Sequence, residues 1–378
     1  MMFSPEATVP WFTAELTASS DTAGFIKGGE WRPEELRSVY SPLGRTAVIG
    51  QCLASEGALN DSSEQALGRH DPRVLTHLPG SYAAMLLREN EFTVMADLVG
   101  QFPIFYKHSD GRTVISSEAS RLRQEGAAPD RLTLAAQIGC SGVRELVVGR
   151  TAFEGINRLE AGHALHADSS GVRVAPYETF ASDPFTTTIE AAEALREALQ
   201  TAVRSRASLG RQLTADCSGI DSTSIAFLAA REVARLPVFT YHDPAYPTDD
   251  LEYVQACLQL AEGKPFEWHT FQVADQITMY QNMAALPLSD QPDQSVVVGA
   301  FEHAYFQALR ESGSELHLTG NGGDALFDVS SVYLTDLIHA RKYRQMLSAA
   351  YEIARIWRTA PYAVITKAWR LAHTNLPE

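Results

Sequence analysis

Two glycine-bearing loops carry the residue types and spacing that bind phosphate groups. The first, DCSGIDST, spans 216–223, and the second, TGNGGDALF, spans 319–327. Small residues let backbone N–H groups face an anion, and a helix that follows such a loop adds free N–H donors and the positive end of its dipole. The predicted ATP- and diphosphate-binding residues are Cys217, Ser218, Gly219, Asp221, Ser222 and Thr223 in the first loop, and Thr319, Gly320, Asn321, Gly322, Gly323 and Asp324 in the second.

Each loop taken alone has a plainer interpretation, namely a capped helix start or a glycine-rich turn. The pair, in this order and with strand and helix patterns between them, favours nucleotide binding.

One aspartate in each loop predicts a metal ion. A carboxylate about 4 Å from a phosphate oxygen is repelled by about 4 kcal/mol per unit charge at an effective dielectric of about 20. Two such penalties would cancel most of what a few N–H donors contribute, so a cation must lie between the charges. We therefore predict that Asp221 and Asp324 are Mg²⁺ ligands and the catalytic residues, with water and phosphate oxygens completing the coordination.

The second half of the chain alternates between strand and helix patterns, which predicts a parallel doubly wound sheet with both loops at the carboxyl ends of its strands. The expected strands are Gln212–Ala215, Val238–Tyr241, Phe266–Phe271 and Glu315–Leu318. The expected helices are Thr188–Arg206, Ser222–Ala234, Asp250–Ala261, Ile277–Ala285 and Val297–Arg310, followed by a helical tail over 331–378.

The first half is rich in short strand patterns separated by turn signals. The expected strands are Thr46–Leu53, Ser81–Arg88, Glu91–Asp97, Ile104–His108 and Arg112–Ser116, arranged as an antiparallel meander. A polar, proline-bearing stretch at 172–187 is the expected linker. We therefore predict an α/β chain of two domains, 1–178 and 188–378, an antiparallel β-rich sandwich followed by a parallel doubly wound domain.

The composition of the chain disfavours several classes of function. The chain has 378 residues and a formal net charge of −15, which disfavours binding to nucleic acid or an anionic membrane. No apolar run is long enough to span a bilayer, and we find no signal peptide. The four cysteines and eleven histidines lack metal-site spacing, so we expect reduced thiols, no zinc site and a cytoplasmic protein.

The chain resembles the asparagine synthetase family, most closely its lasso-peptide cyclase (macrolactam synthetase) branch. ADCSGIDSTSIAFLAAR is similar to that family's ATP-pyrophosphatase loop SGGxDS, and LTGNGGDALF to its second pyrophosphate loop. In the first half, LPGSYAAMLL, VMADLVGQFPIFY, VISSEASRL and TAFEGINRLEAGHAL are similar to the glutaminase-type class II amidotransferase domain. The resemblance covers almost the whole chain and implies an Ntn-like sandwich followed by a PP-loop domain.

The resemblance also implies a reaction. Family members adenylate a carboxylate with ATP, release diphosphate, and let a nitrogen nucleophile displace AMP. In lasso cyclases the carboxylate is an Asp or Glu side chain of a precursor peptide and the nucleophile is that peptide's α-amine. Such enzymes work beside a leader-binding protein and a leader peptidase in antibiotic biosynthesis. Tyr241 matches the position where relatives hold adenine through backbone atoms, with plain packing as the alternative.

Three features depart from the family pattern. Glutaminase activity needs cysteine as the mature first residue, whereas this chain begins MMFS, so we expect no ammonia from glutamine and an inactive amidotransferase-like domain. When the first loop is anchored on Asp221, the family's Ser-Gly-Gly meets Cys217-Ser218-Gly219. β-Lactam synthetases resemble one another in having a tyrosine at the position of Asn321, where it helps to deprotonate the amine. Because asparagine cannot act as a base, this branch is disfavoured here.

Two other segments leave alternatives open. Relatives continue past the position of Glu378 with a lysine at the reacting centre, and Lys367 is expected to be a surface lysine instead. We therefore expect either a fragment or a protein that lacks part of that site. The polar loop SDQPD at 289–293 fits either a substrate-side segment or a solvated turn.

The sequence thus predicts an ATP- and Mg²⁺-dependent ligase that closes a macrolactam in a precursor peptide. Two alternatives remain, namely a β-lactam-synthetase-like cyclase of a small β-amino acid and a non-catalytic homologue that binds nucleotide or peptide.

Overall fold

The chain folds into two compact units, Met1–Thr319 and Gly320–Glu378, which are described separately below. The structure is a computed structural model. It describes residues 11–17, 24–28, 31–32, 35–88, 91–123, 127–140, 147–178, 187–244, 248–261, 263–272, 277–281, 283–286, 290–292, 294–327 and 332–374.

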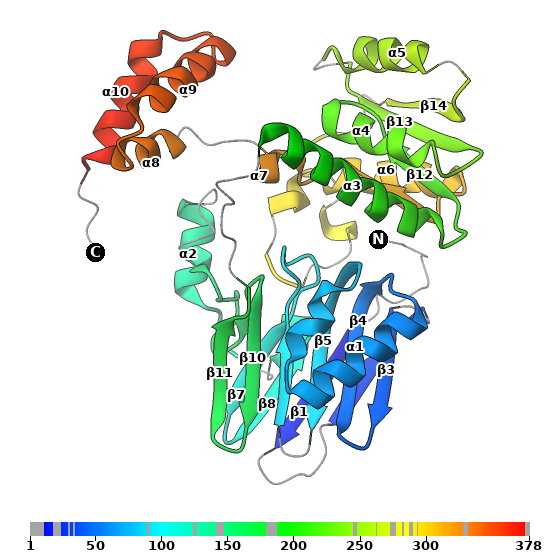
Figure 1. Cartoon of the computed structure of the whole chain (residues 1–378), viewed down its shortest axis with the longest axis vertical. Coiled ribbons are helices and arrows are strands. Elements are labelled where there is room, and N and C mark those ends of the chain that lie inside the picture. Colours follow the sequence, from blue (N-terminus) through cyan, green and yellow to red (C-terminus); the bar gives the residue numbers. More distant parts are fainter. Residues whose placement is uncertain are drawn as a thin grey trace. The chain divides into compact units, whose positions relative to one another are not determined.

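The β-rich part of the first unit consists of two antiparallel sheets (Figure 1). The first has the strand order β2-β1-β8-β7-β9, and the second has the order β11-β10-β6-β5-β4-β3. The strands of the first sheet are β1 (Trp11–Thr17), β2 (Gly24–Gly28), β7 (Phe105–Ser109), β8 (Arg112–Ser116) and β9 (Asn157–Arg158). Those of the second are β3 (Leu36–Ser41), β4 (Gly44–Cys52), β5 (Gly80–Arg88), β6 (Glu91–Met95), β10 (His163–Asp168) and β11 (Gly171–Pro176).

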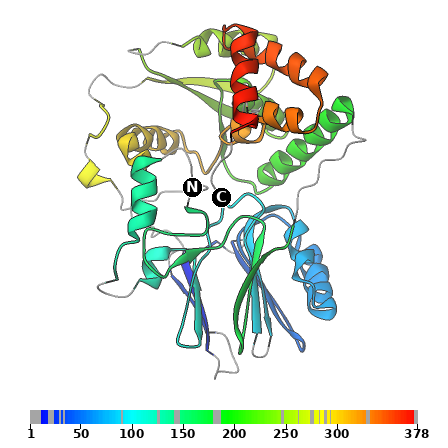
Figure 2. The same ribbon diagram turned by 90° about the vertical axis from the view of Figure 1, so that its left-hand side faces the viewer.

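Alternating side chains build a core on each face of the six-stranded sheet. Ala47 and Ile49 of β4 pack with Phe12 of β1 in the core between the two sheets. Val48, which points the other way, packs with Leu67 of the helix α1 (Glu56–Arg69). The chain therefore forms a sandwich with α1 on the outer face of the six-stranded sheet (Figure 2).

The five strands expected in this half all form, but the single meander is wrong. Strands β4, β5 and β6 pair consecutively, whereas β7 and β8 form a hairpin in the other sheet. Pairing between strands that are distant in sequence explains this division into two sheets, because β8 pairs with β1 and β6 pairs with β10. The expected linker is also wrong at its start, since β11 occupies its first residues and pairs with β10. Residues 179–186 of the linker lie outside the described part.

A further helix and 3-10 turns lie among the described residues of this half. The helix α2 (Arg131–Gly139) begins after the N-cap Asp130. The 3-10 turn η1 (Pro72–His77) follows α1 along the chain, and η2 (Ala119–Leu122) follows β8. Phe105 lies in a small core with η2, and Phe102 and Tyr106 pack on the core between the sheets.

The rest of the first unit contains the expected parallel sheet, with strand order β14-β13-β12-β15. Its strands are β12 (Leu213–Asp216), β13 (Leu236–His242), β14 (Phe266–Gln272) and β15 (Leu316–Leu318), and every neighbouring pair is parallel. Its helices are α3 (Thr188–Ala207), α4 (Ile220–Ala229), α5 (Asp250–Leu260) and α6 (Gly299–Glu311).

One face of this sheet carries the apolar core and the other carries polar and aromatic groups. Leu213, Ala215 and Val238 pack against α3, α4 and α5. On the opposite face, Tyr305 of α6 lies against Phe239 and Phe271 of the sheet. The helix expected at Ile277–Ala285 is wrong, because the described residues there form turns and only a 3-10 turn, η4 (Met283–Ala285).

The second unit is helical, as the tail pattern predicted. It contains α7 (Gly323–Phe327), α8 (Tyr333–His339), α9 (Tyr343–Ile356) and α10 (Pro361–Ala372). Leu334, Met346, Ala350 and Val364 form the core of the last three helices. Across the described part of the chain, no helix has the length and apolar character needed to cross a membrane.

Candidate functional site

The first glycine-bearing loop lies where the sequence placed it, between a parallel strand and a helix. Strand β12 ends at Asp216 and α4 begins at Ile220, two residues before the expected start. Asp221 therefore belongs to the first turn of α4, where the aligned peptide dipoles favour negative charge.

The loop is held in shape by its own hydroxyl groups. The N–H of Ser218 donates to Oγ of Ser222 at 3.0 Å, and Oγ of Thr223 lies 3.5 Å from Sγ of Cys217. The hydroxyl of Thr240 donates to the carbonyl of Cys217 at 2.6 Å. Ser222 and Thr223 are buried, so their hydroxyl groups stabilise the loop, and a phosphate would be bound by backbone N–H groups.

The start of α4 offers such N–H groups. Its N-cap is Gly219, which supplies no capping side chain, so the first turn keeps N–H groups for an incoming anion. A Cβ atom added at Gly219 would meet no atom within 4 Å, which shows open space beside the loop. The exposed Ile220 and the half-buried Asp221 border that space.

A polar network lies directly beneath this loop. Oδ1 of Asp216 accepts hydrogen bonds from the hydroxyl of Tyr305 and from Nε2 of His317, the latter at 2.9 Å. Nδ1 of His317 lies 2.8 Å from the hydroxyl of Thr214, which in turn lies 2.6 Å from the hydroxyl of Ser314. The network joins α6, β15 and the end of β12, and so fixes the strand from which the loop departs.

The chemistry of the network sets the proton positions. A hydrogen bond to the carboxylate of Asp216 requires a proton on Nε2 of His317, and in the tautomer that carries only this proton Nδ1 accepts from Thr214. Burial, together with the charge of Asp216, raises the pKa of Tyr305 far above its usual value. Tyr305 therefore stays a donor to Asp216 throughout the physiological pH range.

Tyr241 lies at the carboxyl end of β13, beside the first loop's strand. Its ring is 6.2 Å from that of Phe271 in β14, and 41% of its surface is exposed. Burial, with the charge of Asp243, raises the pKa of its hydroxyl. The side chain packs on the next strand, whose Phe271 is also the backbone partner of Tyr241, and adenine binding at this position stays a prediction.

The second loop begins at the end of β15 and continues into the second unit. Thr319 closes the first unit, and Gly320 opens the second. Gly322 has a φ of 98°, a conformation that favours glycine, and the N–H of Gly323 donates to the carbonyl of Gly320 at 3.1 Å. Asp324 lies in the first turn of α7 and is exposed. Asp221 and Asp324 belong to different units, so their shared metal site stays a prediction.

The two aspartates nevertheless suit Mg²⁺. Within the described residues, neither carboxylate forms a hydrogen bond or an ion pair, so both keep their oxygen atoms for a hard cation. The described residues contain no cluster of three or more His, Cys, Asp or Glu side chains that would form a metal site by themselves. Each carboxylate by itself is a suitable ligand for a cation whose other ligands are phosphate oxygens and water.

The cysteines contribute no nucleophile to this site. All four are free thiols, and Cys217 is buried beneath the loop. Burial raises the pKa of Cys217 and so disfavours the reactive thiolate.

Two family models match the chain. Residues 194–376 match asparagine synthase, and residues 65–178 match a glutamine amidotransferase domain. Together these domains support a member of the asparagine synthetase family. Both matched regions fall within the predicted domains 1–178 and 188–378, although the boundaries themselves stay a prediction.

Solved structures that are similar to this chain add little to the family assignment. The glutamine phosphoribosylpyrophosphate amidotransferase from B. subtilis, complexed with ADP and GMP, is 12% identical over 82% of this chain and 84% of that chain, with a TM-score of 0.27. The allosteric regulatory enzyme of purine biosynthesis is 13% identical over 82% of this chain and 74% of that chain, with a TM-score of 0.28. At these TM-scores neither likeness carries an argument about this chain. No curated protein matches it in sequence.

The network beneath the loop has little signature in the sequence. Asp216 stands in the first loop without a predicted role, and Tyr305 and His317 lie outside both loops. One signal was present, because the alternation in LHL at 316–318 places His317 opposite its two leucines and on the face where Asp216 ends β12. Tyr305 had no such signal, since its contact is made across 89 residues of sequence.

Proposed function

We propose that this chain is a lasso-peptide cyclase, an ATP-dependent ligase that forms a macrolactam. It would activate an Asp or Glu side-chain carboxylate of a precursor peptide and join it to the peptide's α-amine. The asparagine synthase domain supports the coarser part of this proposal, an ATP-dependent amide ligase. The observation that carries the proposal is the first loop, with an uncapped helix start, open space at Gly219 and the half-buried Asp221.

The reaction balances in two steps. A carboxylate oxygen attacks the α-phosphorus of ATP, and diphosphate leaves with the electron pair of the broken P–O bond. The α-amine then attacks the acyl carbon, AMP leaves, and the amine proton passes to a base. Holding both ends of one peptide together contributes to the second step, because well-oriented intramolecular reactions gain about 7–11 kcal/mol.

The residues of this chain would bind and orient the phosphates. Backbone N–H groups at the start of α4 donate to diphosphate oxygens, and the hydroxyls of Ser222 and Thr223 keep the loop in shape for that task. Asp221 and Asp324 would hold Mg²⁺, which neutralises charge on the leaving diphosphate. A precursor peptide, a leader-binding protein and a leader peptidase are the partners that this function requires.

Diphosphate release tests the proposal. The full chain is incubated with ATP, Mg²⁺ and a synthetic peptide that carries a free α-amine and an internal Asp or Glu. We expect diphosphate, AMP and a peptide that is lighter by one water. Asp324→Ala should abolish the release, whereas Glu352→Ala, which removes an exposed carboxylate from the same unit, should leave it unchanged.

The outcomes separate the competing functions. If a small β-amino acid causes diphosphate release and none of the tested peptides does, the result would indicate the β-lactam-synthetase-like cyclase. ATP binding without diphosphate release under any condition would contradict a ligase and indicate a non-catalytic homologue.

A further inference from the structure

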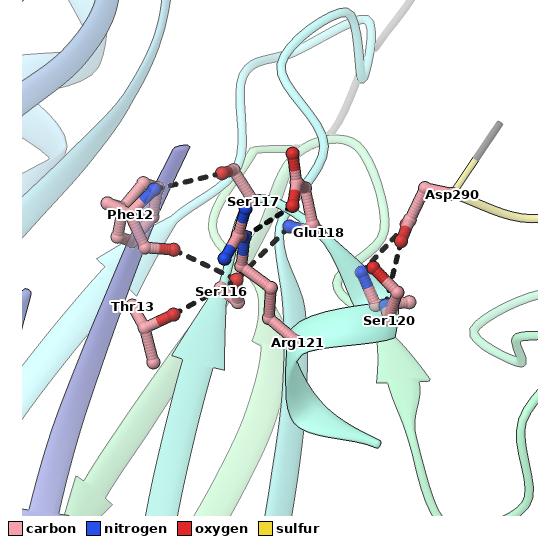
Figure 3. Close-up of polar contacts among 9 residues, drawn as sticks. Phe12, Thr13, Ser116, Ser117, Glu118, Ser120, Arg121 and Asp290 are labelled. Atoms are coloured by element: carbon pink, nitrogen blue, oxygen red, sulfur yellow. Dashed lines mark hydrogen bonds and ion pairs between the residues drawn. The ribbon is translucent and has the colours of Figure 1, made fainter. Parts of the chain in front are cut away.

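The polar loop at 289–293 fits either a substrate-side segment or a solvated turn by sequence, and its described residues, 290–292, bind the sandwich. Oδ2 of Asp290 accepts the backbone N–H of Ala119 at 2.7 Å, and Oδ1 accepts that of Ser120 at 2.7 Å (Figure 3). One carboxylate thus satisfies two consecutive backbone donors that lie 171 and 170 residues away in sequence. Hydrogen bonds to an ionised acceptor are among the strong ones in proteins.

The next residue makes a second attachment. Oε1 of Gln291 accepts the N–H of Ala152 at 3.1 Å. Pro292 follows, and a proline restricts the residue before it to extended backbone. Two adjacent side chains on a stiff segment therefore bind three backbone N–H groups of the sandwich, which a freely solvated turn would not do.

The receiving side is rigid. Ala119 is fully buried, and the residues before it tie the end of β8 to β1. The hydroxyl of Ser116 donates to the carbonyl of Phe12 at 2.9 Å, and Oγ of Ser117 accepts the N–H of Phe12 at 3.2 Å (Figure 3). The N–H of Glu118 then donates to Oγ of Ser116 at 3.1 Å. The N–H groups that bind Asp290 are thus fixed by the sandwich itself.

The other side of the attachment leads to the candidate site. Asp290 lies on the connection between β14 and α6, followed by the 3-10 turn η5 (Gln294–Val297) and then α6. Tyr305, in the second turn of α6, donates to Asp216 at the end of β12. The connection before α6 is therefore attached to the sandwich, and α6 itself is attached to the strand beneath the first loop.

We propose that Asp290 is a positioning residue through which the amidotransferase-like sandwich holds the connection before α6, and so supports the first phosphate loop. The sandwich then serves the ligase half as a structural platform, whatever its own chemistry. All of the contacts involved lie within the first compact unit. The kinetic part of this proposal rests on the proposed function, and the structural part does not.

Hydrogen exchange measured by mass spectrometry tests the structural part in the full chain. The variants are Asp290→Ala, Asp290→Asn and, as a control, Glu193→Ala, which removes an exposed carboxylate from α3. In Asp290→Ala, peptides covering 117–122 and 299–306 should exchange faster by about tenfold or more, because protection reflects local stability. Asp290→Asn keeps one acceptor oxygen and should give an intermediate rate, and the control should match the original chain.

Two exchange results would overturn the proposal. Unchanged exchange at 117–122 in Asp290→Ala would show that the carboxylate does not bind those N–H groups. Faster exchange at 117–122 with unchanged exchange at 299–306 would show that the contact does not position α6. Circular dichroism on each variant identifies any global unfolding. If Asp290→Ala is unfolded, Asp290→Asn replaces it in both comparisons.

Diphosphate release tests the kinetic part. Asp290→Ala should lower kcat/KM by about tenfold, the equivalent of about 1.4 kcal/mol, with partial recovery in Asp290→Asn. An unchanged kcat/KM in a variant with accelerated exchange would overturn the support of the phosphate loop. If the original chain releases no diphosphate, the proposed function fails, and the exchange data alone decide whether Asp290 positions α6.

Discussion

At the scale of single residues, the carboxylate of Asp216 holds the strand end beneath the first loop. It accepts from Tyr305 and His317, whose rings lie edge to face at 5.9 Å. A partly desolvated carboxylate that loses a donor keeps its desolvation cost without the compensating bond. The network therefore makes the loop sensitive to changes in residues that no phosphate would touch.

Tyr305→Phe tests this dependence. The ring contacts with Phe239 and Phe271 remain, but Asp216 loses one donor. The free energy of unfolding should fall by about 1–2 kcal/mol, as expected for a bond to a charged group. Urea unfolding of this variant and of Tyr351→Phe, whose ring is 64% exposed, provides the comparison. Equal stability of the two variants would contradict the role of the network.

Asp130 provides a prediction on pH. It is buried, caps α2 by accepting the N–H of Thr133 at 2.9 Å, and pairs with Arg150. Burial alone would raise the pKa of Asp130, but the bonds from Thr133 and Arg150 outweigh it and hold the pKa below the usual value. Its stabilisation is therefore complete above the unfolded pKa of about 4 and is lost as pH falls through the lower folded pKa.

Asp130→Ala should accordingly cost about 0.5–2 kcal/mol at pH 7, the range measured for lost N-caps. The difference from the original chain should shrink as the pH falls below about 4, because the carboxyl group is then neutral in both folded and unfolded chains. Denaturant unfolding at several pH values measures it. A difference that stays constant down to pH 2 would exclude the ionised carboxylate as the cause.

At the scale of elements, the pairing of β4 with β5 shows how closely two backbones approach in the sandwich. Gly80, opposite Cys52 in this pair, has a φ of 133°, and an added Cβ would collide with the carbonyl oxygen of Gln51. Gly171 at the start of β11 has a nearly identical φ of 132°, but an added Cβ there would meet no atom within 4 Å. A comparison of the two positions therefore separates the cost of a steric collision from the cost of backbone strain.

Gly80→Ala and Gly171→Ala therefore form a matched pair. Both variants should lose stability through the unfavourable φ, and Gly80→Ala should lose about 1–3 kcal/mol more because the neighbouring strand must shift. Thermal unfolding followed by circular dichroism compares them. Equal losses would show that the collision is relieved without cost.

The sequence predicts elements well where one signal decides them. The parallel strands are short apolar runs followed by turn residues, and β12, β13, β14 and β15 all form within two residues of their expected bounds. The segment 277–285 has apolar residues at helical spacing. Its described residues nevertheless form turns, and the N–H of Tyr280 donates to the carbonyl of Val297. Tertiary contacts override local pattern there, and they also divide the first-half strands between two sheets.

At the scale of the whole molecule, the chain joins a sandwich matched by an amidotransferase model to a parallel sheet matched by an asparagine synthase model. The resemblance of its motifs to a known family predicted this combination, and the strand and helix patterns alone predicted the position of the first loop between β12 and α4. The attachment at Asp290 was not predictable, because its acceptor and donors are brought together only by the fold. Backbone donors such as Ala119 and Ser120 leave no side-chain signature in a sequence.

The most direct test is magnesium-dependent ATP binding, measured by equilibrium dialysis with labelled ATP. The full chain should bind ATP in the presence of Mg²⁺. Excess chelator, and separately Asp221→Ala, should weaken binding by about tenfold or more, since about 1.4 kcal/mol separates each factor of ten. Glu193→Ala should bind as the original chain does. Equal affinity of the original chain and Asp221→Ala for Mg²⁺-ATP would contradict a nucleotide site at the first loop.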